Sequence, residues 1–251
     1  MERRNIVVLG GSSGIGRAIA QRFAKEGCRV MVGSNNQALN DETLLTLVGK
    51  GHKGFVVDVS LESEVASLKE FVSKQFGTID VLVNSVGISK GAPMLNSDYN
   101  YWHQTVAVMF YGAIYTTKAL VPLMPDNSRI INITSIHHDR VEMNSSAYGM
   151  CKAAITQLTK SLAVELASKN ILANCIAPGF VNTPMSIKAD GVNELEKEWF
   201  KDNYIKYNHL PLKRAGQPKE VAGVAWFLAG PDASYITGSV ITVDGGLTIT
   251  F

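Results

Sequence analysis

Seven short runs of β-branched and apolar residues, separated by segments of helical length, constrain the fold of this chain most strongly. The runs are 5–10, 29–34, 54–59, 80–85, 129–134, 171–176 and 239–244. They are nearly continuous in apolar residues, as expected for strands that are covered on both faces. Strands that alternate with helices form parallel sheets through right-handed crossovers. The sequence therefore predicts a doubly wound α/β domain of Rossmann type, with a seven-stranded parallel sheet and helices on both faces.

The chain of 251 residues is 46% hydrophobic, which is enough for one large core. No repeat, low-complexity tract or linker interrupts the sequence, so residues 1–251 are expected to form a single domain. The segment 179–216 breaks the alternation with a long polar and aromatic insertion after the sixth strand. Ligands of doubly wound sheets bind beyond the carboxyl ends of the strands. The insertion, at about 184–211, is therefore predicted to be a substrate lid.

Charge and composition argue against several kinds of partner. The net charge is +2 and no dense Lys/Arg run is present, which indicates neither a nucleic-acid nor an anionic-membrane partner. No uninterrupted apolar stretch approaches the length of a bilayer span, and the apolar run 6–10 is too short for a signal peptide. Cys28, Cys151 and Cys175 lack CxxC spacing, and His137–His138 is not a chelating pair. We expect reduced thiols, no metal site and a cytoplasmic protein.

A glycine-rich turn, GGSSGIG, follows the first predicted strand and contains Gly10, Gly14 and Gly16. Glycines allow the backbone to turn sharply and to approach a pyrophosphate, and the helix that follows offers free N–H donors and a favourable dipole. Such a turn also occurs as a simple tight loop. Its position between the first strand and a helix favours dinucleotide binding.

The end of the second strand bears on which dinucleotide is bound. NAD-specific folds usually place an acidic residue there to bind the ribose 2′-OH, whereas Ser34 and Asn35 occupy that point here. Both side chains can donate to a 2′-phosphate and neither repels it, although no arginine stands beside them. Arg17, just after the glycine turn, is either a further phosphate ligand or a solvated helix charge. NADP(H) is therefore favoured as the cofactor, and NAD(H) remains the alternative.

Tyr148 and Lys152 are four residues apart on a predicted helix, so they share one helical face. A YxxxK match alone is frequent by chance. Ser135 strengthens this one, because it closes the fifth predicted strand and so lies at the same edge of the sheet as the glycine turn. The three side chains should therefore converge beside the bound cofactor.

This trio of side chains suits hydride transfer to a carbonyl. A phenol ionises near pH ~10, but a nearby ammonium favours the phenolate and should lower the pKa of Tyr148. Tyr148 then donates a proton as the hydride arrives, or accepts one from an alcohol in reverse. Ser135 orients the substrate oxygen, and Lys152 also holds the nicotinamide ribose. The nicotinamide itself carries the hydride.

Taken together, these motifs resemble the short-chain dehydrogenase/reductase family over essentially all 251 residues. The matching pieces are GGSSGIG, VVDVS, LVNSVG, the Ser135/Tyr148/Lys152 set, IAPGFVNTPM and YITGSVITVDGG. The resemblance implies a catalytic Ser135, Tyr148 and Lys152, NAD(P)-dependent chemistry on CH–OH groups, and a homotetramer. The tetramer interfaces would lie on the helices at about 100–123 and 146–168 and on the C-terminal strand.

The resemblance also implies a set of cofactor-binding residues. Asp58 and Val59 would contact the adenine, and Asn84 would support the adenosine side of the central sheet. The segment 178–183 would bind the nicotinamide carboxamide and the phosphates. The full set is Gly10, Ser12, Ser13, Gly14, Ile15, Gly16, Ser34, Asn35, Asp58, Val59, Asn84, Ser85, Val86, Gly87, Tyr148, Lys152, Pro178, Gly179, Val181 and Thr183.

The sequence departs from the family pattern at two positions. Leu9 replaces the threonine that often precedes the first glycine, which we expect to weaken the turn slightly. Aligned on Trp102 and Gly112, Met109 takes the place of the family's asparagine, which holds a proton-relay water. A thioether cannot donate a hydrogen bond and accepts one only weakly. Either Met109 merely packs and another water path serves Lys152, or the protein is a slow or non-catalytic member; a shift in the alignment is the third explanation.

The sequence constrains the identity of the substrate less than it constrains the type of reaction. TSIHH after the fifth strand resembles glucose 1-dehydrogenase-like enzymes, whereas PLKRAGQPKEVAGVAWFLAG also resembles 3-oxoacyl-carrier-protein reductases, which often carry basic residues near the site mouth. A sugar, a small ketone or a cyclic ketone is compatible with the expected lining. That lining is His137, His138, Arg140, Glu142, Met143 and Asn144 on one side, and Trp199, Phe200, Tyr204 and Tyr207 on the lid.

The sequence therefore predicts an NADP(H)-dependent oxidoreductase that reversibly converts a carbonyl to a secondary alcohol in a small-molecule substrate. One alternative is an NAD-dependent sugar or polyol dehydrogenase. An alternative of another class is a cofactor-binding regulatory protein that has lost turnover, and Met109 is its only support. A nucleotide-sugar epimerase or dehydratase fits less well, because such relatives usually run longer.

Overall fold

Seven strands form one fully parallel sheet in the order β3-β2-β1-β4-β5-β6-β7 in a computed structural model that describes residues 4–89, 93–187 and 190–250. All seven predicted strands are confirmed, although β3 ends earlier than expected and β6 continues further. The chain order reverses between β1 and β4, which is where doubly wound sheets bind ligands. The strands are β1 (Asn5–Leu9), β2 (Arg29–Ser34), β3 (Lys53–Val56), β4 (Val81–Asn84), β5 (Arg129–Ile133), β6 (Leu172–Pro178) and β7 (Val240–Val243).

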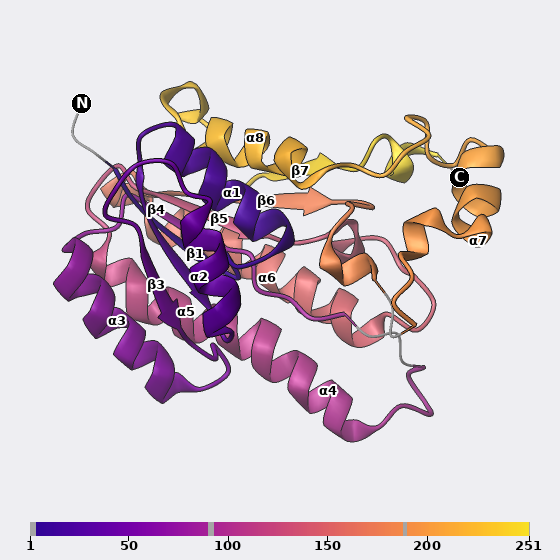
Figure 1. Cartoon of the computed structure of the whole chain (residues 1–251), viewed down its shortest axis with the longest axis horizontal. Helices are drawn as coiled ribbons and strands as arrows, with labels where there is room; N and C mark the ends of the chain where they lie inside the picture. The colour runs from indigo at the N-terminus through magenta and orange to yellow at the C-terminus, as the bar shows by residue number, and fades with distance from the viewer. Residues whose placement is uncertain (1–3, 90–92, 188–189, 251) are drawn as a thin grey trace.

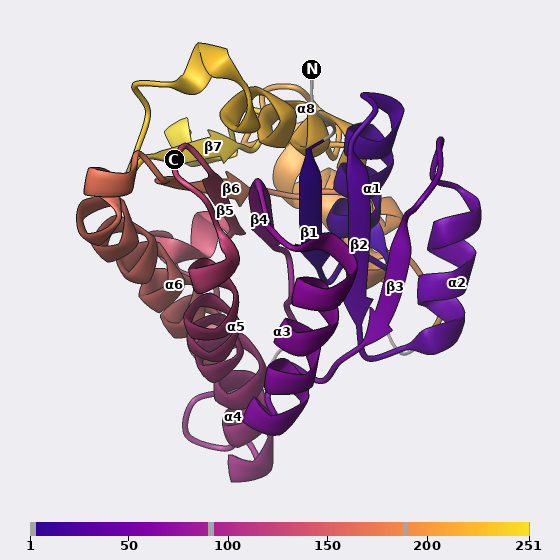
Figure 2. The ribbon, with the colours of Figure 1, turned by 90° about the vertical axis from the view of Figure 1, so that its left-hand side faces the viewer.

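Helices cover both faces of the sheet, as predicted. Figure 2 shows α1, α2 and α8 on one face and α3, α5 and α6 together on the other. The helices are α1 (Gly14–Lys25), α2 (Gln37–Leu45), α3 (Glu62–Phe76), α4 (Tyr99–Thr105), α5 (Gly112–Leu120), α6 (Ser146–Glu165), α7 (Glu198–Phe200) and α8 (Pro218–Ala229).

Successive residues of β1 point to opposite faces of the sheet and so supply two separate cores. Ile6 and Val8 pack with α1 and α8, whereas Val7 and Leu9 pack with α3 and α6; all four are fully buried. This is the period of two that a strand imposes on its side chains. Leu9, the residue in place of the family's usual threonine, thus contributes apolar burial to the core.

One long helical run crosses the α3/α6 face. It consists of α4, the π-helix η1 (Val106–Tyr111), α5 and the 3-10 turn η2 (Val121–Leu123), and it covers 25 residues. By length and composition alone this run could span a membrane, which the sequence analysis did not anticipate. Its buried members Met109, Ala113 and Leu120 belong to the packed clusters shared with α6 and the sheet. One face of the run is therefore packed into the core of the domain.

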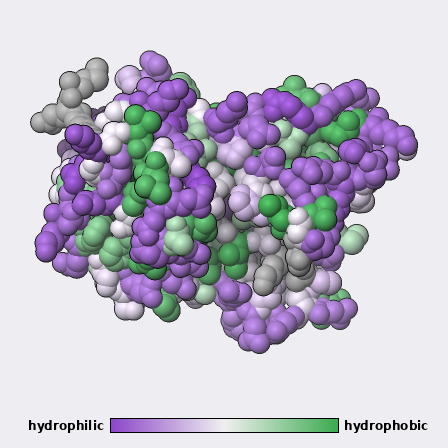
Figure 3. Space-filling view, in the orientation of Figure 1, coloured by the Kyte–Doolittle hydropathy of each residue, from purple (hydrophilic) through white to green (hydrophobic). Residues whose placement is uncertain are grey.

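The insertion between β6 and α8 folds into short turns. They are η5 (Pro184–Ser186), η6 (Glu194–Glu196), α7 and the π-helix η7 (Lys201–Lys206). Four aromatic rings hold this segment together, with centroids 4.7 to 5.6 Å apart: Phe180, Trp199, Phe200 and Tyr204. Figure 1 shows α7 at the same end of the molecule as the C-terminus. On the surface of this view hydrophilic residues predominate, and apolar residues lie in small groups (Figure 3).

Candidate active site

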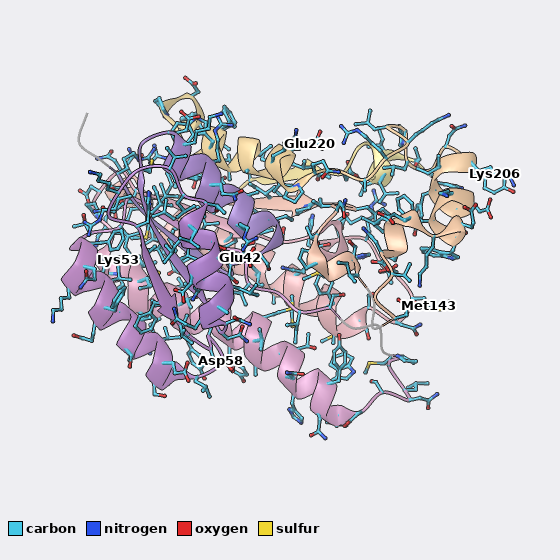
Figure 4. All side chains as sticks on the ribbon, in the orientation of Figure 1. Glu42, Lys53, Asp58, Met143, Lys206 and Glu220 are labelled. Atoms are coloured by element: carbon cyan, nitrogen blue, oxygen red, sulfur yellow. The ribbon has the colours of Figure 1, made fainter. Side chains whose placement is uncertain are left out.

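A cavity of about 550 Å³ lies beyond the carboxyl ends of the strands. Its wall is built from the turns that follow β1 to β4, the last residues of β5 and β6, the first turns of α1 and α6, and part of the insertion. Asp58 and Met143, both on this wall, come from well-separated parts of the molecule (Figure 4). A cavity of this size can enclose a cofactor-sized ligand.

The glycine turn at one end of the cavity fits a pyrophosphate. Gly10 and Gly14 have φ values of +70° and +50°, which side chains rarely adopt. A Cβ on Gly10 would lie 2.7 Å from the backbone of Ser85, and one on Gly16 would collide with the carbonyl oxygen of Gly10. Ser13, the N-cap of α1, makes no side-chain capping hydrogen bond. The first amides of α1 are therefore available to an anion.

Of the three residues considered for the cofactor's 2′ position, the two at the end of β2 line the cavity and Arg17 does not. Ser34 and Asn35 both line the cavity, as predicted for the cofactor site. Arg17 does not line it: its Nε donates to Oγ1 of Thr43 at 2.8 Å, and its Nη1 pairs with Glu42 at 3.1 Å. Arg17 therefore joins α1 to α2, where Figure 4 labels Glu42, and is not positioned as a phosphate ligand.

The turn after β3, which is the predicted adenine contact, forms another part of the cavity wall. Asp58 and Val59 line the wall. The Oδ1 atom of Asp58 accepts hydrogen bonds from the backbone N–H of Ser60 at 2.9 Å and from its hydroxyl at 2.6 Å. The backbone N–H of Asp58 donates to Glu64 at 2.7 Å. These bonds hold the carboxylate in one orientation.

Ser135, Tyr148 and Lys152 converge on the cavity wall. Ser135 shares a side-chain hydrogen bond with Tyr148, and its Oγ also accepts from the backbone N–H of His137 at 3.2 Å. Lys152 is only 3% exposed, and its Nζ donates to the carbonyl of Ile133 at 2.9 Å. The same Nζ lies 5.5 Å from the centroid of the Tyr148 ring. The predicted trio is thus assembled from the end of β5 and the first turns of α6.

The ionisation of this trio differs from the expectation. Burial raises the pKa of Tyr148 to about 12; the hydrogen bond with Ser135 lowers it and the charge of Glu142 raises it. The pKa of Tyr148 thus lies above its ordinary value, whereas the sequence predicted that Lys152 would lower it. Burial also lowers the pKa of Lys152 itself to about 8. At neutral pH Tyr148 is protonated and can act as a proton donor.

Asn84 lies behind the cavity wall and not on it. Its Nδ2 donates to Oδ1 of Asn132 at 2.9 Å, and Nδ2 of Asn132 donates to Oγ1 of Thr159 at 2.7 Å. The thiol of Cys175 donates to the same Thr159 hydroxyl at 3.1 Å. We call these four side chains the buried polar chain. It connects β4, β5, β6 and α6, in keeping with the supporting role expected of Asn84.

Met109 also lies outside the large cavity. It is 1% exposed and packs in a cluster with Ala113, Cys151 and Ile155. Together with Asn84 it lines a separate cavity of about 20 Å³, which is enough space for one water. Met109 belongs to the π-helix η1, where one extra residue widens the turn. The structure therefore places Met109 as a packing residue.

Every predicted cofactor-binding residue except Asn84 lines the large cavity. On the substrate side, His137, Glu142, Met143, Asn144 and Trp199 line it as expected. The expectation is wrong for His138, Arg140, Phe200, Tyr204 and Tyr207, none of which reaches the wall. The lining residues that the sequence analysis did not name include Gln104, on a helix predicted only as an interface, and Glu194, in the aperiodic insertion.

Two of these misplacements have clear causes. Arg140 points toward the C-terminal segment, where its Nη2 donates to the carbonyl of Thr248 at 3.0 Å. Phe200 is 3% exposed because it packs inside the aromatic cluster of the insertion. Among the described residues, no group of three or more His, Cys, Asp or Glu side chains is arranged to hold a metal ion.

A glycine turn that fits a dinucleotide and a Ser/Tyr/Lys trio on the same cavity wall define a doubly wound oxidoreductase domain. A family model described as Enoyl-(Acyl carrier protein) reductase matches residues 10–248. The 3-oxoacyl-[acyl-carrier-protein] reductase of Chlamydia trachomatis is 37% identical over 97% of each chain. Glucose 1-dehydrogenase 2 of Bacillus subtilis is 33% identical over 98% of this chain and 95% of its own length.

Solved structures agree with this assignment. Aldohexose dehydrogenase from Thermoplasma acidophilum, in ligand-free form, is 31% identical and matches with a TM-score of 0.86, covering 99% of this chain and 95% of that one. The chain belongs to the short-chain dehydrogenase/reductase family. It is accordingly an oxidoreductase of the kind that acts on CH–OH or carbonyl groups.

Proposed function

We propose that this protein is an NADP(H)-dependent oxidoreductase that reversibly reduces a carbonyl to a secondary alcohol. The observation that carries the proposal is that Ser135, Tyr148 and Lys152 share one cavity with the glycine turn. The turn residues 10–16 would hold the pyrophosphate, Asp58 the adenine and the segment 178–183 the nicotinamide. Bound there, the cofactor supplies or accepts the hydride.

The residues of the trio take separate roles in the proposed reduction. Tyr148 donates its hydroxyl proton to the substrate oxygen and is left as a phenolate. Ser135 hydrogen-bonds the same oxygen and holds it within reach of Tyr148. Lys152, fixed by the carbonyl of Ile133, stabilises the phenolate and binds the ribose. In the oxidation the phenolate accepts the alcohol proton.

The preference for NADP(H) rests on the end of β2. Ser34 and Asn35 are uncharged and do not repel a 2′-phosphate, and both line the cavity. Because Glu42 and Thr43 hold Arg17, this preference rests on the missing repulsion and on the hydrogen-bond donors of Ser34 and Asn35. Use of NAD(H) with a sugar or polyol is the second candidate, and the relatives named glucose and aldohexose dehydrogenases favour it. Titrating NADPH and NADH separately against the protein decides between the two.

Three further properties belong to the same proposal. The insertion at about 184–211, of which the structure describes 184–187 and 190–211, acts as a substrate lid, because Met185, Glu194 and Trp199 line the cavity. The protein is a cytoplasmic homotetramer that assembles through α4, α5 and α6, where Tyr99 and Val164 are each 78% exposed. Its partners are small molecules, with no nucleic acid or membrane. Light scattering on the purified protein gives the oligomeric state.

The decisive experiment pairs NADPH/NADP⁺ and NADH/NAD⁺ with ketones, β-ketoesters, sugars and polyols. Turnover should appear with at least one pair, and Tyr148→Phe should abolish it while retaining cofactor affinity. Turnover that survives in Tyr148→Phe would refute Tyr148 as the acid/base. Tight cofactor binding without turnover of any substrate would favour the regulatory alternative.

A further inference from the structure

Two carboxylates line the substrate half of the cavity. Glu142 comes from the loop before α6, and Glu194 comes from η6 in the insertion. Among the described lining residues Lys152 is the only lysine or arginine, and it lies at the sheet end of the site. The substrate half of the described wall therefore has acidic character.

The Glu142 carboxylate is held in a defined position. Its Oε2 lies 3.3 Å from Nε2 of His137 and accepts a hydrogen bond from the hydroxyl of Ser145 at 3.1 Å. His137 in turn lies edge-on to the ring of Tyr148, with centroids 5.9 Å apart. The carboxylate thus belongs to the same contact network as the proton donor. Figure 4 shows Met143, its neighbour in the chain, on the side of the cavity near the insertion.

The charges of Glu142 and Glu194 both reach Tyr204, a residue of the insertion. Burial is the main cause of the raised pKa of Tyr204, and the charges of Glu142 and Glu194 raise it further. The charge of Glu142 also raises the pKa of Tyr148. Tyr204 packs edge-on against Trp199, with ring centroids 5.6 Å apart. Both carboxylates therefore lie within electrostatic reach of Tyr204, and both line the cavity that also contains Tyr148.

The remaining wall groups narrow the kind of ligand that fits this space. Gln104 and Asn144 present amides, which both donate and accept hydrogen bonds. Trp199 is 53% exposed and presents an apolar ring on the same wall. Hydroxyl groups satisfy carboxylates and amides together, because they donate and accept, and the C–H face of a sugar packs on an aromatic ring. An ammonium group donates only.

We propose that Glu142 and Glu194 select neutral polyhydroxylated substrates, aldoses or alditols, and reject anionic ones. Each carboxylate accepts hydrogen bonds from substrate hydroxyls, and both repel a phosphate or carboxylate in the same position. Sugar phosphates are therefore excluded. This inference rests on the proposed function and names the substrate class of its site.

The test uses substrates that differ only in charge. A panel of aldoses and alditols, with the phosphate ester and the amino derivative of each, is assayed for kcat/KM with the preferred cofactor. We expect at least one neutral member to exceed its phosphate by 30-fold or more, with the amino derivative no better than the neutral parent. The variant Glu142→Gln/Glu194→Gln should reduce that ratio below threefold. Glu196→Gln, an exposed carboxylate on the same turn, serves as the matched control and should keep the full ratio.

Each outcome decides the inference. Equal or better use of the phosphates overturns it, as does a preference for the amino sugars, which would indicate a cation site. Turnover of simple ketones without turnover or calorimetric binding of any aldose or alditol also overturns it and leaves the proposed function intact. If no substrate at all is turned over, the proposed function fails, and calorimetric binding of the neutral sugars against their phosphates still decides the charge selection.

Discussion

Replacing Lys152 by methionine should stabilise the fold at neutral pH while it abolishes turnover. Lys152 is 3% exposed, and burial lowers its pKa from 10.5 to about 8. The folded protein therefore binds this proton more weakly than the unfolded chain does. The resulting destabilisation is fully present below pH 8 and disappears as the pH rises toward 10.5. Methionine has a similar length and carries no charge.

The magnitude follows from the pKa difference and from one hydrogen bond. A fall from 10.5 to about 8, at ~1.4 kcal/mol per unit, destabilises the fold by ~3 kcal/mol at pH 7 and by ~1 kcal/mol at pH 10. Methionine also leaves the carbonyl of Ile133 without the bond from Nζ, which costs ~1–2 kcal/mol at either pH. Lys152→Met should therefore stabilise by ~1–2 kcal/mol at pH 7 and be neutral or slightly destabilising at pH 10.

The assay is urea unfolding followed by circular dichroism at pH 7 and pH 10. Lys160→Met, an exposed lysine on the same helix, is the matched control and should change stability by less than ~0.5 kcal/mol at both values. Turnover of Lys152→Met should fall at least 100-fold. If the change in unfolding free energy is the same at both pH values, the buried ammonium is not the source of the energy and the reasoning fails.

Three further predictions test other parts of the site. Thr159→Val leaves the amide of Asn132 without its acceptor and should lower the free energy of unfolding by ~1–3 kcal/mol. A decrease smaller than ~0.5 kcal/mol, measured by urea unfolding, would contradict the role of the buried polar chain. Met109→Asn buries an amide among apolar side chains and should lower the free energy of unfolding by ~1–3 kcal/mol. Its kcat/KM should stay within threefold of the original value. A tenfold gain in rate would instead indicate a missing water relay. Because the pKa of Tyr148 is about 12 and that of Lys152 is about 8, reduction should be independent of pH between 6 and 7, where both groups stay protonated. Oxidation, which needs the phenolate, should accelerate with pH over the same range. Equal pH profiles of kcat/KM in the two directions would exclude Tyr148 as the titrating group.

The sheet was predictable because strands covered on both faces show continuous apolar runs, and β2 agrees with its prediction at both ends. The run 54–59 was less well bounded. Its residues have two different environments: β3 ends at Val56 in the sheet, and residues 57–59 turn away to form the cavity wall. The π-helix η1 was not anticipated, since one widened turn hardly changes the apolar pattern of a long helix.

The convergence of Ser135, Tyr148 and Lys152 was predictable because each residue lies near the end of a regular element, where topology determines its position. Glu194 was not, because the insertion has no periodicity that relates sequence spacing to a direction in space. Tyr204 was predicted on the cavity wall but packs behind it with Phe180 at 4.7 Å. The raised pKa of Tyr148 could not be read from its spacing to Lys152, since it depends on how deeply the fold buries the phenol.

The buried polar chain constrains the rotation of α6 about its own axis. Thr159 lies seven residues after Lys152 and eleven after Tyr148, so the three residues project from nearly the same side of α6. A slip of one residue would rotate that side by ~100° and separate Thr159 from Asn132 in a region where no bulk water can replace the bond. Two asparagines, a threonine and a cysteine thus help to hold the side of α6 from which the phenol projects, so contacts inside the fold orient the proposed proton donor.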